Sequence, residues 1–124
     1  MDASTVRIVM AEDSSADAEL AARALRRHGI RADIAVVSSG AEFRQALEGA
    51  RADLIISDNS MPQFSGAQAL AIARTLAPGV PFIFLSGTVP DQLPADSVLA
   101  QATACLDKRR LPELGALVET VLRA

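Results

Sequence analysis

The chain has 124 residues, enough for one domain with a substantial hydrophobic core. Half of its residues are hydrophobic, yet its aromatic residues are four Phe and nothing else, so the core must be mainly aliphatic. A net charge of −3 with no basic run argues against nucleic-acid binding, and no apolar stretch reaches the roughly 20 residues of a membrane-spanning helix.

Short apolar runs alternate with helical patterns in the first part of the chain. Residues 6–11 predict a strand, and the residues after them predict a helix over 15–28 that ends at Gly29. A second strand is expected over residues 33–37. A second helix is expected over 39–48, because a serine stands in the capping position at its start.

The stretch around Asp58 organises the rest of the chain. Residues 54–56 have the apolar, β-branched character of a strand buried on both faces, and the run ends in the Asp58 carboxylate. Pro62 stops the strand, and a helix follows over about 65–77. A fourth buried strand is expected over 81–85. A charge at the end of a buried strand is costly unless it has a partner or a task.

The last part of the chain begins with a weaker pattern. Pro90 and Pro94 interrupt helical continuity, so any helix here is expected to be short, over about 95–102. A fifth strand is expected over 103–107, and a helix over 111–122 carries the strongest apolar stripe. This stripe consists of Leu111, Leu114, Leu117, Val118, Val121 and Leu122.

The alternation of strand and helix, repeated five times, predicts an α/β fold. Helical crossovers of this length make a parallel sheet with helices on both faces. For five strands the usual solution is the flavodoxin-like (βα)5 fold, with strand order 2-1-3-4-5. Ligands of such sheets bind beyond the carboxyl ends of the strands, between strands 1 and 3.

This topology would gather polar residues at the carboxyl edge of the sheet. They are Glu12 and Asp13 after the first strand, Asp58 at the end of the third, Ser86 after the fourth and Lys108 after the fifth. Carboxylates in one crevice repel one another, and a cation that prefers oxygen ligands relieves the repulsion, so Mg²⁺ is the expected metal. With Mg²⁺ bound, Asp58 is a candidate nucleophile that attacks phosphorus and forms an aspartyl-phosphate.

Two further side chains would stabilise the transferred group. Lys108, the single lysine beside eleven arginines, is placed to neutralise the phosphoryl oxygens. The hydroxyl of Ser86 would donate to one of these oxygens, and Gly87 leaves space beside it.

These residues also form a motif with a specific spacing. The motif consists of Glu12-Asp13, Asp58 with Met61-Pro62 and Gly66, Ser86-Gly87-Thr88, and Lys108. In this motif the chain resembles bacterial response-regulator receiver domains over nearly its whole length. The resemblance implies a single receiver domain over residues 1–124, part of a two-component system or phosphorelay.

The resemblance also assigns roles to the acidic residues. Glu12 and Asp13 would hold Mg²⁺ together with Asp58, and the backbone carbonyl of Ser60 would be a further metal ligand. Asp58 would accept a phosphoryl group from a histidine kinase or a histidine phosphotransfer protein.

By the same resemblance Ser86 would sense the phosphoryl group and Lys108 would contact it, but the chain departs from the family near Lys108. Arg109 stands where the family usually has Pro, often after a cis bond. A non-proline cis bond costs about 3 kcal/mol, so we expect a trans bond or a strained loop. Cys105 stands where the family has its switch aromatic, so the usual signalling switch is missing.

Each site residue also has a simpler interpretation. Glu12 and Asp13 would suit the first turn of a helix as acidic residues. Asp58 would suit a turn, because Asp-Asn is a common turn pair. Ser86 would serve as a capping or loop hydroxyl. It is their combination with Lys108 at matching strand ends that favours a site.

Four residues outside this motif are given structural interpretations. His28 is expected to be a cation at the C-terminus of a helix. Cys105 is expected to be a small buried strand residue rather than a redox switch. Arg109 and Arg110 are expected to form a solvated pair.

The leading hypothesis is a phosphoacceptor receiver that acts through contact with a downstream protein. It would be cytoplasmic, because the chain shows no signal peptide and its one cysteine suits a reducing compartment. No nucleic-acid or membrane partner is expected. A homodimer would form through the helix over 95–102, the strand over 103–107 and the helix over 111–122. Self-phosphorylation and autodephosphorylation are the only reactions expected, so the chain is not classed as an enzyme.

Two alternatives predict different behaviour. A receiver-like interaction module would bind its partner equally well with and without phosphate. A Mg²⁺-dependent phosphatase would also use an aspartyl-phosphate, but such enzymes generally carry a second Asp as acid/base two residues after the nucleophile, where this chain has Ser60.

Overall fold

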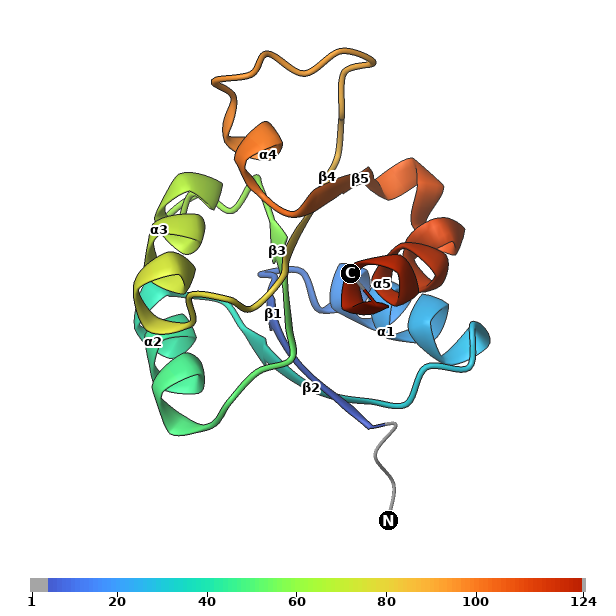
Figure 1. Ribbon diagram of the computed structural model, residues 1–124, viewed down its shortest axis with the longest axis horizontal. Coiled ribbons are helices and arrows are strands. Elements are labelled where there is room, and N and C mark those ends of the chain that lie inside the picture. Colours follow the sequence, from blue (N-terminus) through green and yellow to red (C-terminus); the bar gives the residue numbers. More distant parts are fainter. Residues whose placement is uncertain (1–4, 124) are drawn as a thin grey trace.

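The computed structural model describes residues 5–123, which form a five-stranded parallel sheet with helices on both faces (Figure 1). The strands are β1 (Val6–Ala11), β2 (Ala32–Val37), β3 (Leu54–Asp58), β4 (Phe82–Ser86) and β5 (Ala104–Asp107). Their order is β2-β1-β3-β4-β5, which confirms the predicted flavodoxin-like topology.

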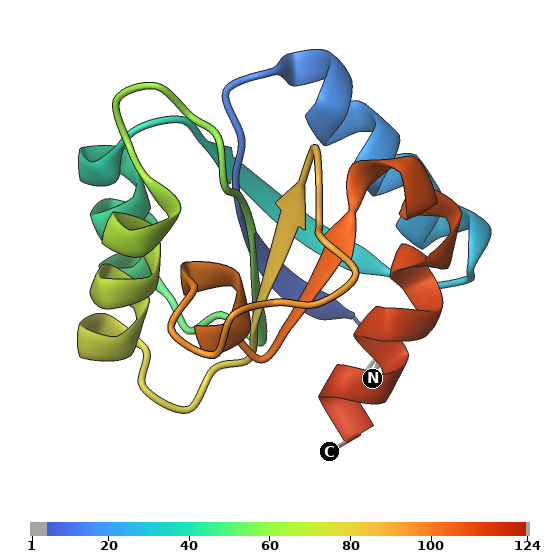
Figure 2. The same cartoon turned by 90° about the horizontal axis from the view of Figure 1, so that it is seen from above.

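The helices form two layers around the sheet. They are α1 (Ser15–Arg27), α2 (Gly40–Gly49), α3 (Gly66–Leu76), α4 (Val98–Gln101), the 3-10 helix η1 (Lys108–Glu113) and α5 (Leu114–Arg123). Helices α1 and α5 cover one face, and α2 and α3 cover the other (Figure 2). In residues 5–123, none of the helices has the length and apolar character needed to span a lipid bilayer.

The central strand β3 supplies side chains to both cores. Leu54 and Ile56 pack on the side of α1 and α5, and Ile55 packs on the side of α2 and α3. All three are fully buried, because successive side chains of a strand point to opposite faces and both faces are covered. This double burial explains why residues 54–56 are continuously apolar instead of alternating.

Serine caps set the starts of the first three helices. Ser14 accepts the N–H of Asp17 at 3.2 Å, and Ser39 accepts the N–H of Glu42 at 3.1 Å. Ser65 begins α3 with a reciprocal capping box. Gly29 follows α1 with a φ of 85°, a left-handed conformation that glycine adopts without strain. These local signals are why the first three predicted helices match α1, α2 and α3 closely.

The segment before β5 is less helical than expected. Helix α4 has four residues, whereas the sequence predicted a helix over 95–102. Pro90 and Pro94 lie in the preceding loop, which stands away from the sheet at the top of Figure 1. Pro94 disfavours the helical conformation at Leu93, and a turn follows in which the Ser97 N–H donates to Pro94 O at 2.9 Å. The helix starts after this turn, where the Ser97 hydroxyl caps it.

The last helix also differs from the prediction over 111–122. A 3-10 helix over Lys108–Glu113 contains Pro112 and a non-helical Arg110, and regular α-helix begins at Leu114. The apolar stripe is narrower than expected, since Leu122 is 37% exposed.

Helices α1 and α5 meet closely through a glycine. A Cβ at Gly115 would overlap the imidazole of His28, so the missing side chain allows the contact. His28 caps the C-terminus of α1, where a cation was expected, and its Nε2 lies 2.8 Å from Glu119 Oε1. This hydrogen bond lowers the pKa of Glu119.

Candidate functional site

Four of the five strands, β1, β3, β4 and β5, deliver the predicted polar side chains to one edge of the sheet, as their parallel order requires. Glu12 and Asp13 follow β1, and the Glu12 N–H extends the sheet by donating to Val37 O at 2.9 Å. Asp58 ends β3 and Ser86 ends β4. The structure thus places the predicted residues at the switch point between β1 and β3 and beside it.

Three carboxylates form the centre of this edge. Glu12, Asp13 and Asp58 each offer an oxygen, and these oxygens lie within 4.8 Å of one another. Glu12 and Asp58 are each 5% exposed, whereas Asp13 is open to solvent. The donor set is entirely oxygen and strongly anionic, which fits a hard cation such as Mg²⁺.

Lys108 is the cation shared by this cluster. Its Nζ donates to Asp17 Oδ2 at 2.8 Å and to Glu12 Oε1 at 3.1 Å, and it lies 3.4 Å from Asp58 Oδ2. Burial opposes its charge, but the hydrogen bonds to Asp17 and Glu12 outweigh this and raise the pKa of Lys108 well above its ordinary value. The ammonium therefore stays charged at neutral pH.

Asp17 is a member of the site that sequence reasoning missed. An acidic residue in the first turn of α1 is favoured by the helix dipole alone, which accounts for the residue type without any contact to Lys108. A local signal did exist, because the Ser14 cap fixes the turn that carries Asp17 next to Glu12.

The environments of Glu12 and Asp58 move their pKa values apart. Burial raises the pKa of Glu12, and the nearby charge of Asp58 adds to this. Burial also acts on Asp58, but the N–H and hydroxyl of Ser60 donate to its Oδ1 at 3.0 and 2.9 Å, and Lys108 lies beside Oδ2. These interactions lower the pKa of Asp58, so this carboxylate stays ionised, as a nucleophile must.

The loop between β3 and α3 packs tightly behind Asp58. A Cβ at Gly66 would overlap Asn59 Oδ1 and would lie 2.8 Å from the ring of Phe84. Glycine at this position therefore lets the start of α3 approach the loop that carries Ser60. The role of the Ser60 carbonyl as a metal ligand stays a prediction.

Ser86 faces its own loop. Its buried hydroxyl donates to Thr88 O at 3.0 Å, and a Cβ at Gly87 would meet no atom within 4 Å. The hydroxyl is a rotatable donor at the same edge as Asp58, because β3 and β4 are adjacent and Asp58 pairs with Leu85.

The turn after β5 is held by an ion pair that the sequence did not predict. Asp107 Oδ1 accepts the N–H of Arg109 at 2.8 Å, and Oδ2 accepts Nη2 at 2.7 Å. Arg109 and Arg110 are both exposed to solvent, as expected, but each is also ion-paired, Arg109 with Asp107 and Arg110 with Glu113. In residues 5–123 no peptide bond is cis, so the bond between Lys108 and Arg109 is trans, as expected without proline.

Cys105 is a half-buried strand residue, somewhat more exposed than expected. It lies on β5 opposite Phe84 of β4 and packs against the core beneath α2 and α3. Burial raises the pKa of its thiol, which favours the unreactive protonated form.

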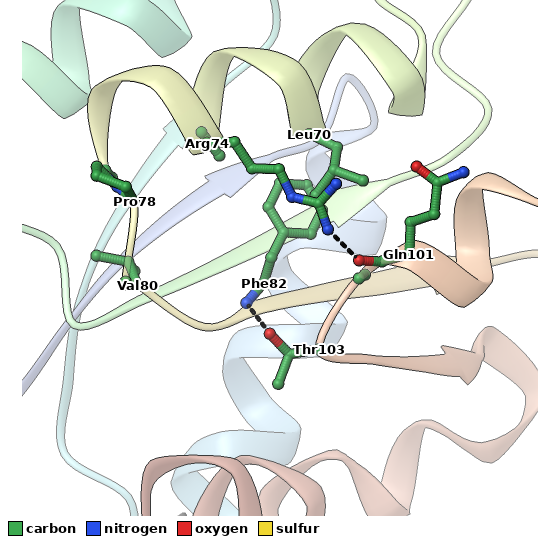
Figure 3. Close-up of a pocket in the computed structure, with 11 residues that line it drawn as sticks. Leu70, Arg74, Pro78, Val80, Phe82, Gln101 and Thr103 are labelled. Carbon is green, nitrogen blue, oxygen red and sulfur yellow. Dashed lines mark hydrogen bonds between the residues drawn. The ribbon is translucent and has the colours of Figure 1, made fainter.

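A pocket of about 410 Å³ lies away from the acidic cluster, at the C-terminus of α3 and the amino end of β4 (Figure 3). Arg74 points across it and donates to the carbonyl of Gln101, and the Phe82 N–H donates to Thr103 Oγ1 at 3.0 Å. The lining residues include one cation and no carboxylate, so this pocket lacks the acidic donor set found at the carboxyl edge.

Proteins of known sequence show similarity over most of the chain. The chain is 32% identical over 85 residues to the transcription factor SKN7 of Saccharomyces cerevisiae, covering 68% of this chain and 13% of SKN7. It is 34% identical over 82 residues to the transcriptional regulatory protein GlrR of Escherichia coli, covering 63% of this chain and 18% of GlrR. It is 32% identical over 96 residues to the sensor kinase CckA of Brucella abortus, covering 73% and 10%. The chain thus spans less than a fifth of each of these relatives.

Solved structures show the same fold. The receiver domain of a sensor histidine kinase from Pseudomonas aeruginosa, with a magnesium ion coordinated in its active-site cleft, aligns with a TM-score of 0.80 and 22% identity. The alignment covers 97% of this chain and 99% of that one. The phosphorylated cyanobacterial phytochrome response regulator RcpA aligns with a TM-score of 0.76 and 22% identity, covering 95% and 94%.

A family model described as the response regulator receiver domain matches residues 8–119. The match includes every residue of the carboxylate and lysine cluster. The chain therefore belongs to the family of receiver domains found in two-component response regulators.

Proposed function

We propose that this chain is a Mg²⁺-dependent phosphoacceptor whose phosphorylation site is Asp58. A carboxylate oxygen of Asp58 would attack the phosphorus of a phosphohistidine on a histidine kinase or phosphotransfer protein. The new O–P bond forms as the P–N bond breaks, and the imidazole leaves with the electron pair. The observation that carries the proposal is the buried, ionised Asp58 beside both Lys108 and an acidic pair.

The residues of the cluster would divide the work of this transfer. Glu12, Asp13 and Asp58 would hold Mg²⁺, which when bound would neutralise negative charge on the phosphoryl oxygens. Lys108 would exchange a carboxylate contact for a phosphoryl oxygen, which its flexible stem permits. The Ser86 hydroxyl would rotate away from Thr88 O and donate to another phosphoryl oxygen.

The output is proposed to be contact with a downstream protein in the cytoplasm. We propose no catalytic turnover beyond self-phosphorylation and autodephosphorylation. A homodimer through α4, β5 and α5 stays a prediction, with α4 contributing only one helical turn.

The test is an intact-mass measurement after incubation with phosphoramidate and Mg²⁺. The wild type should gain one phosphoryl group, and the Asp58→Ala variant should gain none. Asp33→Asn is the matched control, because it alters an exposed carboxylate at the opposite edge of the sheet. Absence of an adduct on the wild type with several phosphodonors would refute the proposal.

A phosphate-independent interaction module is a second candidate, supported by the short α4 and by Cys105 in place of an aromatic ring. It predicts the same partner affinity for the wild type and for Asp58→Asn, with or without phosphodonor. A large change in affinity on phosphorylation would exclude it.

A further inference from the structure

Asp107 and Arg109 bind each other across Lys108, which lies between them in the chain. Asp107 Oδ1 accepts the Arg109 N–H at 2.8 Å and its Nε–H at 3.0 Å, and Oδ2 accepts Nη2 at 2.7 Å. The Asp107 side chain is buried and caps the N-terminus of η1. Three hydrogen bonds therefore fix the backbone on both sides of Lys108.

The same carboxylate also holds the neighbouring loop. The Val89 N–H donates to Asp107 Oδ2 at 3.2 Å, and Asp107 pairs with Ser86 across β4 and β5. Residues 86–89 form a short turn that Ser86 closes through its bond to Thr88 O. Asp107 is thus a common anchor for the turn that carries Ser86 and for the segment that carries Lys108.

Both groups would need such an anchor to act together on one phosphoryl group. Lys108 has a long, flexible stem. Ser86 is followed by Gly87, and a Cβ at Gly87 would meet no atom within 4 Å, so no packing contact holds the loop at this residue. Efficient transfer requires the two donors to be held close to their final positions, and misplacement by about an ångström can cost roughly a hundredfold in rate.

We propose that the Asp107–Arg109 pair is a positioning device for phosphoryl transfer, which sets Lys108 and the turn over 86–89 relative to each other. The inference rests on the proposed function, because it concerns transfer to Asp58. Asp107 and Arg109 are positioning residues, since they act through Lys108 and Ser86 and not on the reacting atoms.

Arg109→Ala is the first test. Arg109 is 76% exposed, so its truncation opens no cavity, and the backbone N–H of residue 109 can still donate to the Asp107 carboxylate that caps η1. Arg110→Ala is the matched control, because Arg110 is also exposed and ion-paired but binds Glu113. Arg109→Ala should slow phosphorylation by phosphoramidate about tenfold and weaken beryllofluoride binding similarly, whereas Mg²⁺ affinity, followed by NMR, should stay within about twofold. Arg110→Ala should match the wild type.

Asp107→Asn is the second test. The amide oxygen can keep the cap by accepting the Arg109 N–H, but the NH₂ group of the amide then faces both Arg109 Nη2 and the Val89 N–H, and a donor cannot accept either bond. Its rate loss should resemble that of Arg109→Ala. The double variant should be no slower than the slower single variant, because the two residues act as one unit.

Three results would overturn the inference while the wild type is still phosphorylated. The first is that Arg109→Ala is phosphorylated at the wild-type rate. The second is that the Mg²⁺ affinity of Arg109→Ala falls by as much as its phosphorylation rate. The third is that the double variant loses rate by the product of the two single losses. A wild type that takes up no phosphoryl group would instead refute the proposed function and this inference with it.

Discussion

Lys108 balances the acidic cluster, and replacing it with methionine should destabilise the fold. Its contacts with Glu12 and Asp58 involve carboxylates that are each 5% exposed, whereas its contact with the more exposed Asp17 adds less than about 1 kcal/mol. Removing one partner of a fully buried pair costs about 3–5 kcal/mol. Lys108 itself is 23% exposed and Glu12 can take up a proton, so we expect a loss of about 2–3 kcal/mol at neutral pH without Mg²⁺.

The assay is urea unfolding followed by circular dichroism, with and without Mg²⁺. Magnesium ions should stabilise Lys108→Met more than the wild type, because the variant has lost its own counter-charge. Arg123→Met is the control, since Arg123 is 79% exposed and lies 3.9 Å from Glu119. Its stability should stay within about 0.5 kcal/mol of the wild type.

The pH dependence gives an independent check on this reasoning. Without Lys108 the pKa values of Asp58 and Glu12 should both rise, so the folded variant would bind protons more readily than the unfolded chain. Its stability should then increase as the pH falls from neutral toward about 5. In the wild type the pKa of Asp58 is lowered, so the stability that the ionised Asp58 contributes is lost only when the pH falls below 3.8, the ordinary pKa of the group. A variant as stable as the wild type at neutral pH, or one that weakens on this acidification, would refute the argument.

Two further predictions concern the packing and the acid stability of the fold. Gly115→Ala should destabilise the protein by about 1–3 kcal/mol in urea unfolding, because its Cβ would overlap the His28 ring. The double variant with His28→Ala should recover part of this lost free energy of unfolding. If the effects of the two substitutions on the free energy of unfolding simply added, the contact between residues 28 and 115 would be contradicted. The hydrogen bonds from Arg109 hold the pKa of Asp107 far below its ordinary 3.8, so the stability that Asp107 contributes is present above that pH and is lost below it. Asp107→Asn should therefore approach wild-type stability on acidification below about pH 4, and a constant difference would contradict the pairing.

Most of the fold could be predicted because its signals are local. The capping serines Ser14, Ser39 and Ser65 and the left-handed Gly29 fix helix ends within a few residues of sequence. The continuous apolar run over 54–56 indicated a strand covered on both faces. Once five strands alternate with helices, a parallel sheet follows, and with it the meeting of Glu12, Asp13 and Asp58.

Other features depend on packing across long stretches of chain. The sequence indicated a short helix over 95–102, but a turn from Pro94 to Ser97 and the Ser97 cap reduce it to a single helical turn. Asp17 was not predicted as a site residue, because its bond to Lys108 joins residues 91 positions apart.

The sequence by itself determined the α/β architecture and the set of carboxylates at the strand ends, because periodicity and caps are properties of neighbouring residues and five strands that alternate with helices have one usual order. Only the tertiary structure decided which partners those charges take. Lys108 is shared by three carboxylates, Arg109 turns back onto Asp107, and His28 lies over Gly115. Such pairings depend on where the end of a flexible side chain lies after the two hydrophobic cores have formed. No periodic pattern in the sequence specifies that position.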